Sequence, residues 1–136
     1  MRVLVVEDNP ETQEPLIALL CDEGHVVDYA GNGDGALVRM TVARPDFMLL
    51  DHMMPSKSGL DFLKQVRTDR SHPDWAAIPA VIVTAVDSQA VADIEQAIVE
   101  HNLHPAVVVR KPCDPGELLA LVSAHAATLA QQPPAR

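Results

Sequence analysis

The sequence predicts an α/β fold: a doubly wound sheet of five parallel strands, flavodoxin-like, with strand order 2-1-3-4-5. Short runs rich in Val, Ile and Leu recur without alternation, which is typical of strands buried on both faces. Longer segments with apolar residues at helical spacing separate these runs, as crossovers between parallel strands require. The length of 136 residues with 48% hydrophobic residues suits one domain with a sizeable core.

Residues 3–6 are the first predicted strand, and an acidic pair followed by Asn9-Pro10 ends it. We expect the first helix to start near Glu11 or Thr12, because Pro15 then falls among the N–H groups that need no intrahelical partner. Gly24 ends this helix, and residues 26–29 form the second strand. Cys21 lies within the helical pattern, where we expect a small buried hydrophobe.

The middle of the chain predicts a second helix, a third strand and a third helix. The glycine-rich stretch 31–35 lacks the spacing of phosphate-binding loops, so we interpret it as the loop before the second helix. Residues 47–50 form the third strand, and Asp51 follows directly. Ser58 begins the third helix with Asp61 three residues on, as in a capping box. We expect Trp75, in the loop 69–79, to cover an edge of the core.

Two further strands and two further helices complete the pattern. The strands are residues 80–84 and 106–109, and the fourth helix starts at Asp87 or Ser88. Asp114-Pro115 has the form of a helix start with proline at the first helical position. The apolar pattern fades after Leu129, so we expect a domain over 1–130 and a disordered tail over 131–136.

Composition narrows the classes of function. The formal net charge of −9 argues against direct nucleic acid binding through phosphate neutralisation, and suits basic or neutral partner surfaces. The two cysteines form neither a CxxC motif nor a metal pair, and the spacing of His101 and His104 matches no usual zinc pattern. No segment has the length of a membrane span or the cleavage site of a signal peptide, so we expect a cytoplasmic protein.

Polar residues lie at or just after the ends of four of the five predicted strands: Glu7-Asp8, Asp51, Thr84 and Lys111. Strands one and three are neighbours at the switch point of such a sheet, so Asp8 and Asp51 should meet at its carboxyl edge. Crowded carboxylates repel unless a cation lies between them, and Mg²⁺ suits such a site. A solvated acidic loop would account for Glu7-Asp8 alone, but not for the coincidence with the other strand ends.

This set, together with Met54-Pro55, Gly59, Ala85 and Pro112, resembles the receiver domain of two-component response regulators over nearly the whole chain. The resemblance implies that Asp51 accepts a phosphoryl group from a histidine kinase or a histidine phosphotransfer protein. It also implies Mg²⁺ as cofactor, bound by Glu7, Asp8, Asp51 and the backbone carbonyl of Met53. Lys111 would neutralise one phosphoryl oxygen, and the Thr84 hydroxyl would bind another. Output would then pass through the face of helix four, strand five and helix five.

The sequence departs from the family pattern at three places. Val108 stands where the family often has Tyr or Phe, which rules out an aromatic switch at this position. The stretch between Thr84 and Lys111 looks longer than usual, which affects the shape of the output face. Met53 and Val86 occupy positions that often carry polar residues placing the attacking water, so we hypothesise slow dephosphorylation.

Three alternatives to a stand-alone receiver are open. A phosphatase of the haloacid dehalogenase type needs a second Asp two residues after the nucleophile, and Met53 stands there. A pseudo-receiver would bind proteins without using phosphate. A receiver from a larger regulator would carry an output domain, and none follows the fifth helix in this sequence. We therefore expect a signalling protein rather than an enzyme, which contacts a downstream protein and whose fourth helix permits a homodimer.

Overall fold

The computed structural model describes residues 1–52, 54, 57–84, 88–110 and 115–131. It contains one five-stranded parallel sheet in the order β2-β1-β3-β4-β5, as predicted. The strands are β1 (Arg2–Val6), β2 (Val26–Ala30), β3 (Phe47–Asp51), β4 (Ala80–Thr84) and β5 (Ala106–Arg110). The helices are α1 (Pro10–Asp22), α2 (Gly33–Val42), α3 (Gly59–Thr68), the 3₁₀ helix η1 (Pro73–Ala77), α4 (Ser88–Glu100) and α5 (Pro115–Gln131).

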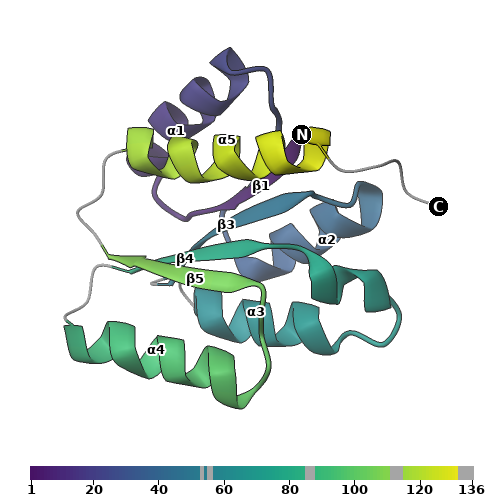
Figure 1. Cartoon of the computed structure of the whole chain (residues 1–136), viewed down its shortest axis with the longest axis vertical. Helices are drawn as coiled ribbons and strands as arrows, with labels where there is room; N and C mark the ends of the chain where they lie inside the picture. The colour runs from purple at the N-terminus through teal and green to yellow at the C-terminus, as the bar shows by residue number, and fades with distance from the viewer. Residues whose placement is uncertain (53, 55–56, 85–87, 111–114, 132–136) are drawn as a thin grey trace.

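Helices cover both faces of the sheet (Figure 1). The core between the sheet and α1 and α5 includes Leu16, Leu20, Leu118 and Val122. The core on the other face is larger and includes Phe62, Leu63 and Val66 of α3, with Ile94 and Ile98 of α4. Because the three central strands β1, β3 and β4 are buried on both faces, they need no polar side, which explains their continuous apolar runs.

The strand register brings the predicted site residues to one edge. Val6 of β1 pairs with Leu50 of β3, so Glu7 comes level with Asp51. Asp51 pairs in turn with Val83 of β4, one residue before Thr84. All strands are parallel, so their carboxyl ends share this edge of the sheet.

Short polar side chains cap the N-termini of three helices, α1, α2 and α3. Asn9 and Asn32 accept hydrogen bonds from the backbone N–H groups of Glu11 and Gly35, and Ser58 accepts one from Asp61. The predicted Ser58 cap is therefore confirmed. Gly24 follows α1 with φ of 87°, a left-handed conformation that favours glycine at the end of a helix.

Several local predictions need correction. α1 begins at Pro10 rather than at Glu11 or Thr12, so Pro15 lies inside the helix on its exposed side. Cys21 is exposed, not buried. It follows the buried Leu20 by one residue, which is about 100° around the helix and off the apolar stripe.

The loop 69–79 is more ordered than predicted, because it contains η1. Trp75 is only 2% exposed, which confirms that it covers an edge of the core. Its ring stacks on that of His72 with centroids 3.8 Å apart. α5 extends to Gln131, one residue past the predicted boundary, and residues 132–136 lie outside the described part. None of the helices in the described residues has the length and apolar character needed to cross a membrane.

Candidate functional site

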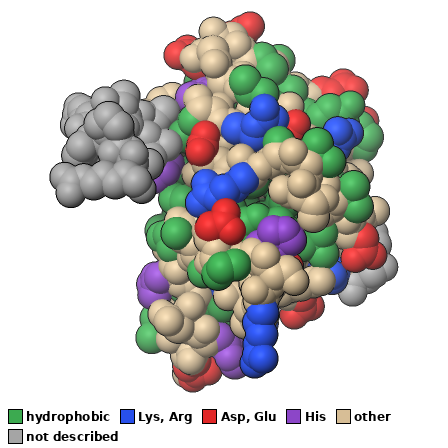
Figure 2. Space-filling model, turned by 90° about the vertical axis from the view of Figure 1, so that its right-hand side faces the viewer, with side chains coloured by type: hydrophobic (Ala, Val, Ile, Leu, Met, Phe, Trp, Pro, Cys, Tyr) green, Lys and Arg blue, Asp and Glu red, His purple; other side chains and the backbone are tan. Residues whose placement is uncertain are grey.

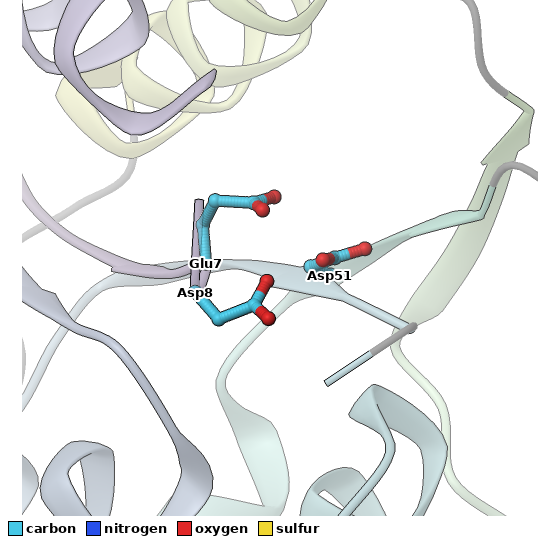
Figure 3. Close-up of side chains that lie close together, drawn as sticks. All are labelled: Glu7, Asp8 and Asp51. Carbon is cyan, nitrogen blue, oxygen red and sulfur yellow. The ribbon is translucent and has the colours of Figure 1, made fainter. Parts of the chain in front are cut away.

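Three carboxylates converge at the carboxyl edge of the sheet (Figure 3). Glu7 and Asp8 follow β1, and Asp51 is the last residue of β3. Each offers a carboxylate oxygen, and these oxygens all lie within 4.8 Å of one another. Glu7 and Asp51 are buried at 8% and 4% exposure, whereas Asp8 is exposed. The prediction that the strand order brings Asp8 and Asp51 together is therefore confirmed.

Neighbouring polar groups hold Glu7 in place. A carboxylate oxygen of Glu7 accepts a hydrogen bond from the backbone N–H of Asn9 at 3.2 Å. The side-chain amide of Gln13, one turn into α1, donates to the backbone carbonyl of Glu7 at 3.2 Å. The contacts of Asn9 and Gln13 with Glu7 were not predicted from the sequence. Asn9 before Pro10 is a recognisable helix start, but no local pattern marks Gln13.

Asp51 is held by backbone contacts on two sides. The N–H of the next residue, His52, donates to the Val83 carbonyl of β4 at 2.9 Å. The Gly59 N–H donates to the His52 carbonyl at 3.2 Å, which brings the start of α3 against the end of β3. A Cβ on Gly59 would lie 2.6 Å from the Asp51 carbonyl oxygen, so this approach requires glycine.

Lys57 connects the loop after Asp51 to α2 and α3. Its ammonium group lies 3.4 Å from a carboxylate oxygen of Asp34 and contacts the side-chain oxygen of Gln65. The aliphatic part of the Lys57 side chain lies close to Gly33. A Cβ added to Gly33 would be 2.9 Å from the Cδ of Lys57. No local sequence pattern marks Lys57, because its partners lie on separate segments.

Thr84 ends β4 and is fully buried. It pairs with Arg110, the last residue of β5, at the same edge of the sheet. Met53 and Lys111, the two other predicted site residues, lie outside the described residues, as does Val86. The structure thus brings together Glu7, Asp8 and Asp51 and places Thr84 on the neighbouring strand end.

The donor set fits a hard divalent cation. Mg²⁺ binds oxygens at about 2.1 Å, so oxygens on opposite sides of the ion lie about 4.2 Å apart. A spread within 4.8 Å therefore needs only a small contraction of the three side chains. Within the described part of the chain, Glu7, Asp8 and Asp51 are the one group of three acidic, His or Cys side chains close enough to share an ion.

Comparisons with known proteins agree with this geometry. The family model of the response regulator receiver domain matches residues 3–123. The sensory transduction protein RegX3 of Mycolicibacterium smegmatis is 35% identical over 122 residues, which are 90% of this chain and 49% of RegX3. The DNA-binding response regulator MtrA of the same organism is 33% identical over 126 residues, 91% of this chain and 50% of MtrA. The chain thus spans about half the length of these curated relatives.

Solved structures show the same fold. The chemotaxis protein CheY4 of Vibrio cholerae superposes with a TM-score of 0.76 at 26% identity, covering 90% of this chain and 96% of CheY4. A response regulator receiver protein from Pseudomonas putida gives a TM-score of 0.73 at 30% identity, covering 90% of this chain and 95% of that protein.

Proposed function

Since this chain belongs to the response regulator receiver domains of two-component systems, we propose that Asp51 accepts a phosphoryl group from a histidine kinase or a histidine phosphotransfer protein. The observation that carries the proposal is the buried Asp51 carboxylate, grouped with Glu7 and Asp8 at the switch point of the sheet. The Asp51 carboxylate is the nucleophile, and its position at the end of β3 determines the direction in which it meets the phosphoryl donor.

The chemistry is a transfer between two side chains. A carboxylate oxygen of Asp51 attacks the phosphorus of the donor's phosphohistidine, and the phosphorus–nitrogen bond on the opposite side breaks. Such a transfer depends mainly on positioning and on neutralising charge. Glu7, Asp8, Asp51 and the Met53 carbonyl would hold Mg²⁺, which supplies that neutralisation when bound.

We assign Thr84 and Lys111 to the phosphorylated state. The phosphoryl group adds roughly −1.5 to −2 charges beside a buried strand end. The Thr84 hydroxyl binds one phosphoryl oxygen, and the Lys111 ammonium neutralises a second as a point charge. Support for this comes from the position of Thr84, buried on β4 next to the strand that ends in Asp51.

The output surface in this proposal is the face of α4, β5 and α5. Val108 of β5 is half-buried and packs against the core cluster that also contains Ile94 and Ile98, so a switch here uses an aliphatic contact rather than a rotating aromatic ring. We propose a domain over residues 1–130 that acts in the cytoplasm on a downstream protein. The stand-alone form stays a prediction, and the length of the protein expressed from the native gene tests it.

The test is phosphorylation by a small donor. The protein is incubated with Mg²⁺ and acetyl phosphate and followed by intact mass, with Asp51→Asn as the variant and Asp46→Asn as a matched control. We expect an acid-stable, base-labile phosphoryl adduct in the wild type and the control, and none in Asp51→Asn.

Beryllofluoride binding covers the case of a receiver that accepts phosphate only from its protein donor. If the wild type forms no adduct and also binds no beryllofluoride, the phosphate switch is wrong. The chain would then be a constitutive protein-binding module.

A further inference from the structure

β2 lies at one edge of the sheet, next to β1. The Val26 N–H donates to the Met1 carbonyl at 3.0 Å, so the backbone groups of Val26 point towards the β1 side. The hydrogen-bonding groups of successive residues alternate in direction along a strand. The N–H and C=O groups of Val27 and Tyr29 therefore point away from β1, towards the open edge.

Little in β2 blocks this edge from pairing with another strand. Sheet edges are commonly protected by Lys, by Pro or by a bulge. β2 has the sequence VVDYA, without Lys or Pro, and its register with β1 runs through all of its residues without a bulge. Its one charged residue, Asp28, forms an ion pair with Arg2 of β1 at 2.8 Å. The edge therefore offers backbone groups with no uncompensated charge on the strand itself.

Exposed hydrophobic side chains accompany the open edge. Val26 and Tyr29 of β2 are 53% and 51% exposed. α2 packs against β2 and adds Val38 and Val42, at 64% and 81% exposure. On the side of the molecule where the strands begin, hydrophobic side chains reach the surface among charged ones (Figure 2). Apolar area left in water beside an open strand is typical of an interaction surface.

Arg39 of α2 brings a positive charge to this edge. Its guanidinium lies 6.0 Å from the centroid of the Tyr29 ring, and it forms no ion pair with a carboxylate of the described residues. Lys64 and Arg70 share the lack of a carboxylate partner there, but no large hydrophobic side chain is exposed on α3 or η1. Of these three cations, Arg39 is therefore the one beside an open strand and exposed apolar groups.

We propose that the edge of β2 binds an extended segment of a partner protein, which joins the sheet as a further strand. The segment pairs with the outward N–H and C=O groups of Val27 and Tyr29, and one carboxylate of the segment meets Arg39. Glu23 and Asp8 are exposed near the two ends of β2, so a segment with several carboxylates would be repelled.

A second copy of the chain fits this edge less well. Two copies related by a twofold axis would pair their β2 strands antiparallel, and matching all outward groups sets Val27 opposite Tyr29. The two Asp28 residues would then lie directly opposite each other, and like charges in that position are destabilising. β2 and β5 are opposite edges of the sheet, so this site is separate from the output surface proposed above.

The probe is a synthetic peptide of alternating Thr and Val with one central Glu. Its controls are the same peptide with Lys for Glu and the same peptide with every backbone nitrogen methylated. Binding is measured by fluorescence anisotropy. We expect the Glu peptide to bind about fivefold more tightly than the Lys peptide, although the net charge of −9 favours the Lys peptide in general. The methylated peptide should not bind, because it has no N–H to donate. Equal binding of the methylated peptide, or no binding of the Glu peptide, would overturn the proposal.

Hydrogen exchange followed by NMR locates the bound peptide. The N–H groups of Val27 and Tyr29 should exchange quickly in the free protein and about tenfold more slowly with the Glu peptide at saturation. The Asp28 N–H faces β1 and should exchange slowly in both states. Unchanged exchange at Val27 and Tyr29 would place the peptide elsewhere and overturn the proposal.

Matched variants test the cation. Arg39→Gln should weaken binding of the Glu peptide by about fivefold, whereas Arg70→Gln, at another exposed position, should weaken it by less than about twofold. Equal losses in the two variants would rule out Arg39 as the partner of the carboxylate.

A second pair of variants tests the backbone. Tyr29→Pro removes the ring and an outward N–H that β1 does not use, and a proline is tolerated in an edge strand at such a position. Tyr29→Val removes the ring alone. We expect Tyr29→Pro to bind about tenfold more weakly than Tyr29→Val, with folding checked by circular dichroism. Equal affinities would contradict strand addition, and a dimer that sedimentation shows to be lost in Tyr29→Pro would identify a second copy as the occupant and overturn the proposal.

Discussion

Gly59 determines how closely α3 approaches the proposed phosphoryl acceptor. A methyl group at this position would lie 2.6 Å from the Asp51 carbonyl oxygen and 3.2 Å from the His52 Cα, both backbone atoms of one short segment. Gly59→Ala must therefore displace the end of β3 or the start of α3. We expect a loss of about 1–3 kcal/mol in the free energy of unfolding and slower phosphorylation by acetyl phosphate.

Gly31→Ala is the matched control, because a Cβ at Gly31 meets no atom within 4 Å. Urea unfolding and intact-mass kinetics on both variants provide the measurement. An unaltered rate in Gly59→Ala would show that the position of Asp51 does not depend on this contact.

His25 links stability to pH. Burial lowers the pKa of His25 below 6.5, and the positive charge of the N-terminal amine, 3.3 Å from its Nδ1, lowers it further. As the pH falls below 6.5, the unfolded chain takes up a proton that the folded protein does not yet bind. Stability is therefore lost with acidification, from 6.5 down to the folded pKa.

The variant His25→Gln should remove this part of the pH dependence. Urea unfolding at pH 7.5 and pH 5.5 is expected to show a smaller difference for His25→Gln than for the wild type. Equal differences would mean that His25 titrates alike in both states.

At the scale of elements, Arg67 of α3 joins three segments. Its guanidinium donates to the carbonyls of Trp75 in η1 and of Leu103 and Pro105 in the α4–β5 connection, each at 2.9 Å. Burial lowers the pKa of Arg67 to about 10, so the group stays charged at neutral pH while carbonyl oxygens replace its water. The C-terminal end of α4 is thereby fixed to α3.

Arg67→Met leaves these three carbonyls without their donor. We expect a loss of about 2–4 kcal/mol in the free energy of unfolding, and a shift in Trp75 emission because η1 is released. Arg70→Met, at an exposed position just after α3, should change stability by less than about 0.5 kcal/mol. Denaturant unfolding, monitored by fluorescence, compares the stabilities of the two variants. Equal losses of stability would show that Arg67 does not hold α3 to η1 and to the connection between α4 and β5.

For the whole molecule, we expect ion binding by the carboxylate group to be coupled to folding. Mg²⁺ that binds only the folded chain should raise the free energy of unfolding by about 2.7 kcal/mol at one hundred times its dissociation constant. Asp8→Asn should lose most of this response. The same variant should be slightly more stable than the wild type without Mg²⁺, because it removes one of three crowded charges.

Asp22→Asn, at an exposed site on α1, is the control for net charge and should keep the full response. Thermal unfolding with and without Mg²⁺ measures both effects. A response that survives in Asp8→Asn would place the ion elsewhere.

The sequence by itself determined the architecture and the main residues of the site. Continuous apolar runs, helical spacing between them and right-handed crossovers left little choice but a parallel sheet. Within that sheet, Asp51 at the end of the third run and Glu7-Asp8 at the end of the first had to meet at one edge. The strand order and the grouped carboxylates of the structure confirm this.

Only the tertiary structure decided which side-chain contacts hold these elements together. Several contacts join segments that no local pattern relates. Arg67 donates to three backbone carbonyls, the Gln13 amide donates to the Glu7 carbonyl, and the aliphatic part of Lys57 lies against Gly33. Cys21 shows the same limit, because its exposure depends on which side of α1 meets the sheet. The periodicity of a sequence indicates which residues face the core, whereas contacts between distant segments depend on how the elements pack in three dimensions.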